Sequence, residues 1–89
     1  MRIEGHTDDG PLGRGRFRDN WDLSASRAAA VASYIESSGA VDGKLLSATG
    51  FGSMHPLTSN GSPAGREANR RVEMVMELNP GDTIGKLGK

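Results

Sequence analysis

The region from residue 24 to residue 38 carries apolar side chains at the spacing of an amphipathic helix. Its apolar members follow the i, i+3, i+4, i+7 pattern: Ala28, Val31, Ala32 and Ile35. Polar residues occupy the other side, as expected for a helix with one face on a core. Ser24 is a favourable N-cap, and Gly39 stands where a helix end favours a left-handed residue. The pattern predicts a helix over residues 24–38 whose apolar stripe is buried.

Alternation of apolar and polar residues predicts a strand near the C-terminus. The apolar positions fall on every second residue: Val72, Met74, Met76 and Leu78. This period of two indicates a strand over residues 71–78 with one buried face, which Pro80 and Gly81 end. Further strands are predicted at residues 2–5 and 45–49.

Turn-forming residues divide the rest of the chain. Ser62 and Pro63 mark a helix start, which gives a short helix over residues 63–69. Glycine, proline and polar residues make residues 8–22 and 50–62 loops. The resulting order of strand, helix, strand, helix, strand predicts an α+β fold. We expect a two-layer α/β sandwich with one sheet and the main helix on a single face.

A chain of 89 residues supports one small core. We expect a domain over residues 1–79 and a flexible tail over residues 80–89. The longest uninterrupted apolar run, residues 28–32, is far too short to span a bilayer, and the chain opens without a signal-peptide pattern. If the protein is exported, its signal lies outside this chain.

Charge and cysteine content exclude several classes of function. Eleven basic and eleven acidic residues cancel, so no general field draws the chain onto nucleic acid or an anionic membrane. The absence of cysteine excludes disulfides and thiolate metal sites. Any charged ligand must therefore be held locally.

The first chemical cluster is the Gly-His-Thr-Asp-Asp run at residues 5–9, where the first strand should end. The adjacent carboxylates Asp8 and Asp9 can coordinate a hard cation, act as acid and base, or hold an ammonium group. Their spacing does not choose among these. For His6, a loop imidazole hydrogen-bonded to backbone is favoured over a metal ligand, because the only other histidine, His55, lies in a distant loop.

The second cluster lies where a loop turns into the main helix. If Ser24 is the cap, Arg27 falls at the third helical position, where the helix dipole disfavours a cation. Either Asp22 or Asp8 pairs with it, or a ligand carboxylate shares it with the free N–H groups of the first turn. Both alternatives stay open. Trp21 could be a stacking platform, although a partly buried lid on the core is the commoner role.

The third cluster, residues 65–71, holds three arginines, Arg66, Arg70 and Arg71. The neutral total charge and the few aromatic residues argue against a nucleic-acid patch. A structural role is favoured, in which an arginine pairs with a carboxylate of the first loop and ties the short helix to it. The candidate carboxylates are Asp8, Asp9 and Asp19.

Three segments, in this order, resemble the OmpA-like domain family: residues 3–9, 20–28 and 65–73. Residues 49–52 and Pro56 are similar to the family's glycine-rich strand end. The resemblance runs over residues 2–78, and the order and spacing of the motifs make it specific.

The double aspartate, Pro11 and the Asn20-Trp21 pair look most like the MotB branch of that family, the stator subunit that anchors the flagellar motor to the cell wall. The resemblance implies a non-enzymatic module, without cofactor or metal, that binds peptidoglycan through the diaminopimelate of the stem peptide. Carried over by position, the peptidoglycan-binding residues are Asp8, Arg27, Thr7, Asn20, Leu23 and Arg71.

Diaminopimelate suits two of these residues by its charge. Its side chain ends in a zwitterion, so its ammonium group suits Asp8, and its carboxylate suits Arg27 together with the helix N-terminus. Arg71 matches a position that supports the pocket from the last strand.

The resemblance also implies a location and partners. It implies a periplasmic domain of a protein anchored in the inner or outer membrane, with peptidoglycan and a stator subunit as partners and no nucleic acid. An envelope anchor of the OmpA or Pal type is the alternative. A peptidoglycan hydrolase is less favoured, because it would need an activated nucleophile or a metal-bound water.

The family pattern begins with a strand and a long helix that are missing before residue 2 in this sequence. Their absence predicts an open sheet edge or an uncovered apolar face, which a homodimer would cover. A purely dimerising domain that has lost ligand binding is a further alternative.

Overall fold

The computed structural model describes residues 1–13 and 15–76 of the chain. The elements follow the predicted order: β1 (Arg2–His6), α1 (Asn20–Ser38), the 3-10 helix η1 (Gly43–Leu45), β2 (Ser47–Gly50), α2 (Pro63–Asn69) and β3 (Arg71–Val75). The end of the last predicted strand, residues 77 and 78, and the predicted tail lie outside the described residues. None of the helices in the described part is both long and apolar enough to cross a bilayer.

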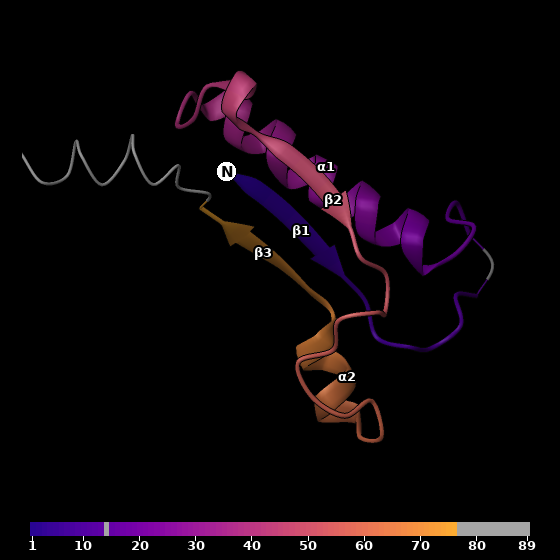
Figure 1. Cartoon of the computed structure of the whole chain (residues 1–89). Helices are drawn as coiled ribbons and strands as arrows, with labels where there is room; N and C mark the ends of the chain where they lie inside the picture. Colours follow the sequence, from indigo (N-terminus) through magenta and orange to yellow (C-terminus); the bar gives the residue numbers. More distant parts are fainter. Residues whose placement is uncertain (14, 77–89) are drawn as a thin grey trace, which may run out of the picture.

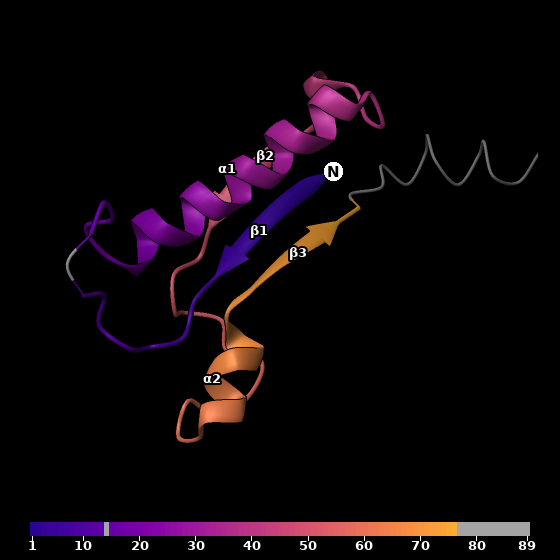
Figure 2. The same ribbon diagram turned by 180° about the vertical axis from the view of Figure 1, so that it is seen from behind.

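The three strands form one mixed sheet in the order β2-β1-β3. The central strand β1 is parallel to β2, with Ile3 opposite Ala48, and antiparallel to β3, with Ile3 opposite Met74. Parallel strands require a crossover, and α1 supplies it on one face of the sheet (Figures 1 and 2). The predicted α+β architecture is confirmed, and the short helix α2 stands beyond one end of the sheet (Figure 1).

Helix α1 begins earlier than predicted. Its N-cap is Asp19, whose side chain accepts a hydrogen bond from the Asp22 N–H, and Ser24 is buried inside the helix. Both residues are good N-caps, and nothing in residues 20–23 breaks a helix, so the upstream cap extends the helix. The predicted end is confirmed, because Gly39 adopts the left-handed conformation with φ 77°.

The core lies between α1 and the two strands beneath it. Ile3 and Ala28 are fully buried, whereas Val31 and Ile35 of the predicted stripe are only half-buried. Gly5 faces the helix so closely that a Cβ there would overlap the Ser24 carbonyl oxygen. Glycine at this position therefore lets the helix backbone approach β1.

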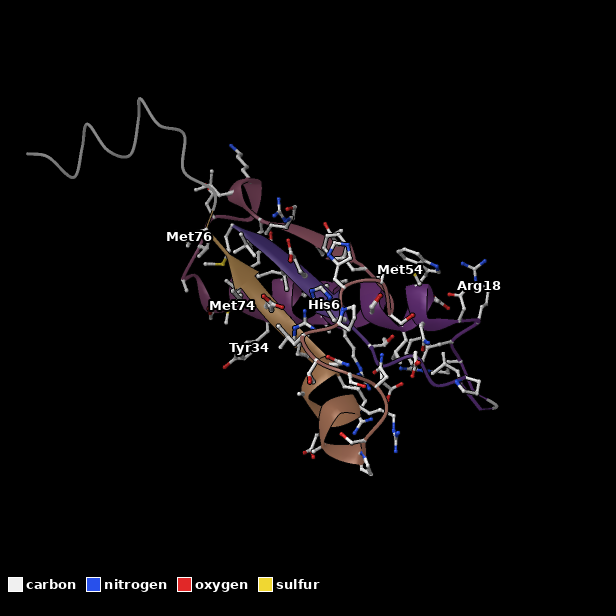
Figure 3. All side chains as sticks on the ribbon, turned by 60° about the horizontal axis from the view of Figure 1, so that its bottom comes forward. His6, Arg18, Tyr34, Met54, Met74 and Met76 are labelled. Carbon is white, nitrogen blue, oxygen red and sulfur yellow. The ribbon has the colours of Figure 1, made fainter. Side chains whose placement is uncertain are left out.

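The prediction that the last strand buries its apolar face is wrong. Met74 is 62% exposed and Met76 is 65% exposed, and both project from the sheet at its β3 edge (Figure 3). Directly opposite residues of paired strands point to the same face, so Met74 shares the helix-covered face with Ile3. Helix α1 packs over β1 and β2, which leaves this face of β3 open.

Candidate functional site

Three segments that are distant in sequence meet at the end of β1. The Thr7 N–H donates to the Gly52 carbonyl at 2.9 Å, and the Gly52 N–H donates to Ser24 Oγ at 2.9 Å. Thr7 is buried, and its hydroxyl donates to the Asp8 carbonyl at 2.8 Å. These bonds fix the backbone on which Asp8 stands, between the first turns of α1 and the loop after β2.

Asn20 ties the start of α1 to the loop that follows β1. Its side-chain amide donates to the Gly10 carbonyl at 3.1 Å and to the Asp8 carbonyl at 3.4 Å. Leu23 and Arg27 follow Asn20 at i+3 and i+7, so the three lie along one stripe of the helix. Arg27 stands about 10 Å along the axis from Asn20. The structure thus brings Asn20 to the Asp8 loop, and Leu23 and Arg27 follow Asn20 along the same side of α1.

The Asp8 carboxylate is held by two donors. One oxygen accepts from Arg70 Nη1 at 2.5 Å, and the other accepts from the Gly10 N–H at 2.9 Å. The hydrogen bond from Arg70, followed by that from Gly10, lowers the pKa of Asp8. Its side chain is still 17% exposed. Asp8 is therefore an ionised carboxylate with a fixed orientation and access to solvent.

The pairing of Asp8 with Arg70 confirms that an arginine of the third cluster ties the short helix to this loop. Arg27 has a different position from the predicted one. Because α1 begins at Asn20, Arg27 is its eighth residue and lies beyond the free N–H groups of the first turn. Within the described residues it has neither hydrogen bond nor ion pair, and Asp22 instead contacts Arg18 at 3.9 Å.

Asn69 organises the loop that precedes α2. It is fully buried, and its Oδ1 accepts from the Leu57 N–H at 2.8 Å and the Thr58 N–H at 3.2 Å. Its Nδ2 donates to the Thr58 carbonyl at 3.0 Å and to Asn60 Oδ1 at 2.8 Å. Since Arg70 follows directly, Asn69 fixes the backbone from which Arg70 reaches Asp8. Periodicity gives no signal for such a residue.

His6 is the last residue of β1 and not a loop residue. Its ring is buried and stacks on Phe51 at 5.3 Å between centroids, and His55 lies 6.2 Å away in the same cluster. Neither ring nitrogen has a hydrogen-bond partner in the described part of the chain, so the predicted bond to backbone is wrong. No group of three potential ligands in residues 1–13 and 15–76 is placed to hold a metal ion.

Arg71 and two carboxylates surround the His6 ring on the face of the sheet opposite α1. Nε2 of His6 lies 3.7 Å from both Glu4 and Glu73, and Arg71 bonds to Glu73 at 2.5 Å and to the His55 carbonyl at 3.0 Å. Burial first, and Arg71 next, lower the pKa of His6. Arg71 thus supports the loop that carries His55, without contacting Asp8.

We expect the His6 ring to make folding pH-dependent. Its pKa is lowered in the folded chain, so below about pH 6.5 the unfolded chain binds more protons and the free energy of unfolding falls. His6→Phe keeps a stacking ring and removes this titration. Between about pH 7 and pH 5, above the ordinary pKa of carboxylates, the variant should lose less stability than the parent in urea unfolding. Equal losses would contradict the assignment.

Trp21 is half-exposed beside the same segments. Its indole lies against Gly52, where an added Cβ would be 3.3 Å from Cδ2, and the side chain is 51% exposed. The favoured role as a partly buried lid on the core is wrong, because the side chain is exposed and its ring lies on a loop backbone.

Known proteins resemble this chain over most of its length. The model of the OmpA family matches residues 1–70. Motility protein B of Bacillus subtilis is 39% identical over 74 residues, which is 83% of this chain and 28% of that protein. The peptidoglycan-binding protein ArfA of Mycobacterium tuberculosis is 43% identical over 76 residues, which is 85% of this chain and 22% of that protein.

A solved structure shows the same fold. The crystal structure of the C-terminal domain of Helicobacter pylori MotB superposes with a TM-score of 0.85 at 33% identity, covering 98% of this chain and 64% of that one. The chain therefore spans less than a third of the curated relatives and about two thirds of this solved domain. With a family model that matches residues 1–70 and a shared fold, this chain belongs to the OmpA family.

Proposed function

We propose that this domain anchors its protein to peptidoglycan by holding the diaminopimelate of the stem peptide between Asp8 and Arg27. The observation that carries the proposal is the Asp8 carboxylate, which is ionised, oriented by two donors and still open to solvent. The similarity to a peptidoglycan-binding protein supports the same ligand class.

The acceptor capacity of Asp8 suits an incoming ammonium group. A carboxylate offers about four lone-pair positions, and Arg70 and Gly10 use two of them. A ligand ammonium can therefore bind Asp8 while Arg70 stays in place.

Arg27 would take the carboxylate of the same ligand. Its guanidinium has five donors, and no side chain of the described residues occupies them. In this arrangement Thr7 and Asn20 orient the Asp8 backbone, and Leu23 gives an apolar wall between the two charges. Arg71 acts from further away, through the loop it supports.

A sedimentation assay with purified sacculi tests this function and its rival. The parent chain should co-sediment with sacculi and leave them intact, since we assign it no catalytic step. Release of soluble muropeptides would instead indicate a hydrolase. Absence of the chain from the pellet would contradict cell-wall anchoring.

The location that fits this role is the periplasm, within a longer protein held in the inner or outer membrane. The likeness to MotB favours a stator protein with a motor partner over an envelope anchor of the OmpA or Pal type. Co-purification of the full-length protein with a stator subunit would separate the two.

The outer edge of β3 favours self-association. In the described residues β3 pairs only with β1, and two exposed methionines, Met74 in β3 and Met76 just after it, lie along this edge strand. An antiparallel pairing that sets Met74 opposite Met74 of a second copy places Val72 opposite Met76 on the same face. It also keeps the two Glu73 carboxylates from facing each other directly. We therefore propose a second copy of this chain as the occupant of this edge.

We predict that Met74→Lys weakens self-association by about tenfold or more, because a charged edge residue disrupts strand pairing and loses apolar contact. Sedimentation velocity over a concentration series measures the change. Met54→Lys is the matched control, since Met54 is 57% exposed in a loop outside β3. A parent chain that stays monomeric at about millimolar concentration, or a Met74 variant that associates as the parent does, would contradict the proposed interface.

A further inference from the structure

Trp21 combines exposure with a rigid support. It is the chain's single tryptophan and is 51% exposed, in the first turn of α1. In the described residues the indole Nε1–H has no hydrogen-bond partner. Trp21 therefore offers an exposed aromatic surface and an N–H donor without a partner in the described residues.

The support under the ring is the backbone of Gly52. A Cβ at Gly52 would lie 3.3, 3.5 and 3.6 Å from Cδ2, Cε3 and Cε2 of Trp21. These near-equal distances place that point over the ring face and not beside one atom. Gly52 has φ 59°, and hydrogen bonds to Thr7 and Ser24 hold it in place. One ring face is thus fixed on the loop, which leaves the opposite side to supply the exposed area.

This ring adjoins the Asp8 site through two short connections. Asn20, the residue before Trp21, holds the Asp8 and Gly10 carbonyls, and Gly52 beneath the ring bonds to Thr7, the residue before Asp8. The ring and the carboxylate therefore share one rigid support. The platform proposed below requires a ligand that extends from Asp8 to this ring.

We propose that Trp21 is a platform for a pyranose ring of the glycan strand. One face of a pyranose presents C–H groups and its rim presents hydroxyls, which match an apolar ring face and a free N–H donor. A preorganised aromatic side chain also loses little conformational entropy on binding. The inference rests on the proposed function, because it assigns the sugar part of the ligand whose peptide part Asp8 and Arg27 hold.

The test compares three ligands: the peptide-free N-acetylated disaccharide of the glycan, the free stem peptide, and the disaccharide carrying that peptide. In the parent, the disaccharide alone should change the tryptophan fluorescence, which reports on Trp21 only. By calorimetry, the disaccharide-peptide should bind about threefold to tenfold more tightly than the peptide.

Trp21→Ala should remove this gain while the affinity for the free peptide changes less than about twofold, and Trp21→Phe should keep part of it. Tyr34→Ala is the matched control, because Tyr34 is an exposed aromatic residue of α1 at 73% exposure and should leave all affinities unchanged. Thermal unfolding checks each variant, and Trp21→Phe carries the test if the alanine variant unfolds.

Two results would overturn the platform: a parent that binds peptide and disaccharide-peptide equally, or Trp21 variants that lose affinity for both ligands alike. If the proposed function is wrong, the free peptide does not bind the parent at all. The fluorescence response to the disaccharide then tests the role of Trp21 separately.

Discussion

Asp8→Asn should weaken binding of a diaminopimelate-containing stem peptide by about tenfold to a hundredfold. A hydrogen bond to an ionised group contributes roughly 1.5–3 kcal/mol, and asparagine keeps the shape of aspartate while it loses the charge. The fold should suffer less, because the Asp8–Arg70 pair is partly exposed and such pairs stabilise by about 1 kcal/mol or less. Calorimetric titration and urea unfolding of the same variant measure both effects.

Asp9→Asn is the matched control, because it makes the same change one residue away on an exposed side chain. It should bind as the parent does. Arg27→Ala should match the loss seen for Asp8→Asn. If both site variants bind peptide like the parent, or Asp9→Asn is equally weak, the assignment of the site is wrong. Asp19 is unsuitable as a control because its side chain caps α1.

Asn69→Ala should lower the free energy of unfolding by about 2–4 kcal/mol. The fully buried amide makes four hydrogen bonds, and its removal leaves a cavity and unpaired backbone groups in the loop before α2. The same change should weaken peptide binding, since it releases the backbone that carries Arg70. Urea unfolding at neutral pH gives the stability change.

Asn60→Ala provides the graded comparison. It removes the one hydrogen bond that Asn60 accepts from Asn69 and should cost about 1 kcal/mol or less. Equal effects of the two substitutions, or an Asn69 variant as stable as the parent, would contradict the organising role of this amide.

Helix boundaries were predicted correctly where the sequence offers a single capping or terminating residue. Ser62 followed by Pro63 predicted α2 with its observed bounds, and Gly39 predicted the end of α1. The start of α1 was missed because Asp19 and Ser24 are both good caps, and the residues between them tolerate a helix. Because of that error, Arg27 was predicted at the third helical position, beside free N–H groups. The structure places it in the third turn, beyond those groups.

Features that depend on tertiary packing could not be predicted from periodicity. The alternation in β3 predicted a strand correctly, but whether α1 covers Met74 depends on which strands lie under the helix. The same holds for the contact of His6 with Phe51 and His55, which join from separate segments. An ion pair between an arginine of residues 65–71 and a carboxylate of the first loop was predicted, because the two segments carry opposite charges. The Asp8–Arg70 pair is that contact.

The proposed site recognises the zwitterionic end of diaminopimelate. The most direct test titrates the domain with two stem peptides that differ only in the third residue, diaminopimelate or lysine, and follows amide shifts. Lysine keeps the ammonium group for Asp8 and lacks the carboxylate for Arg27. We expect the diaminopimelate peptide to bind at least about tenfold more tightly, with shifts around Asp8 and Arg27. Arg27→Ala should abolish the difference. Equal binding of the two peptides, or shifts confined to other parts of the domain, would contradict it.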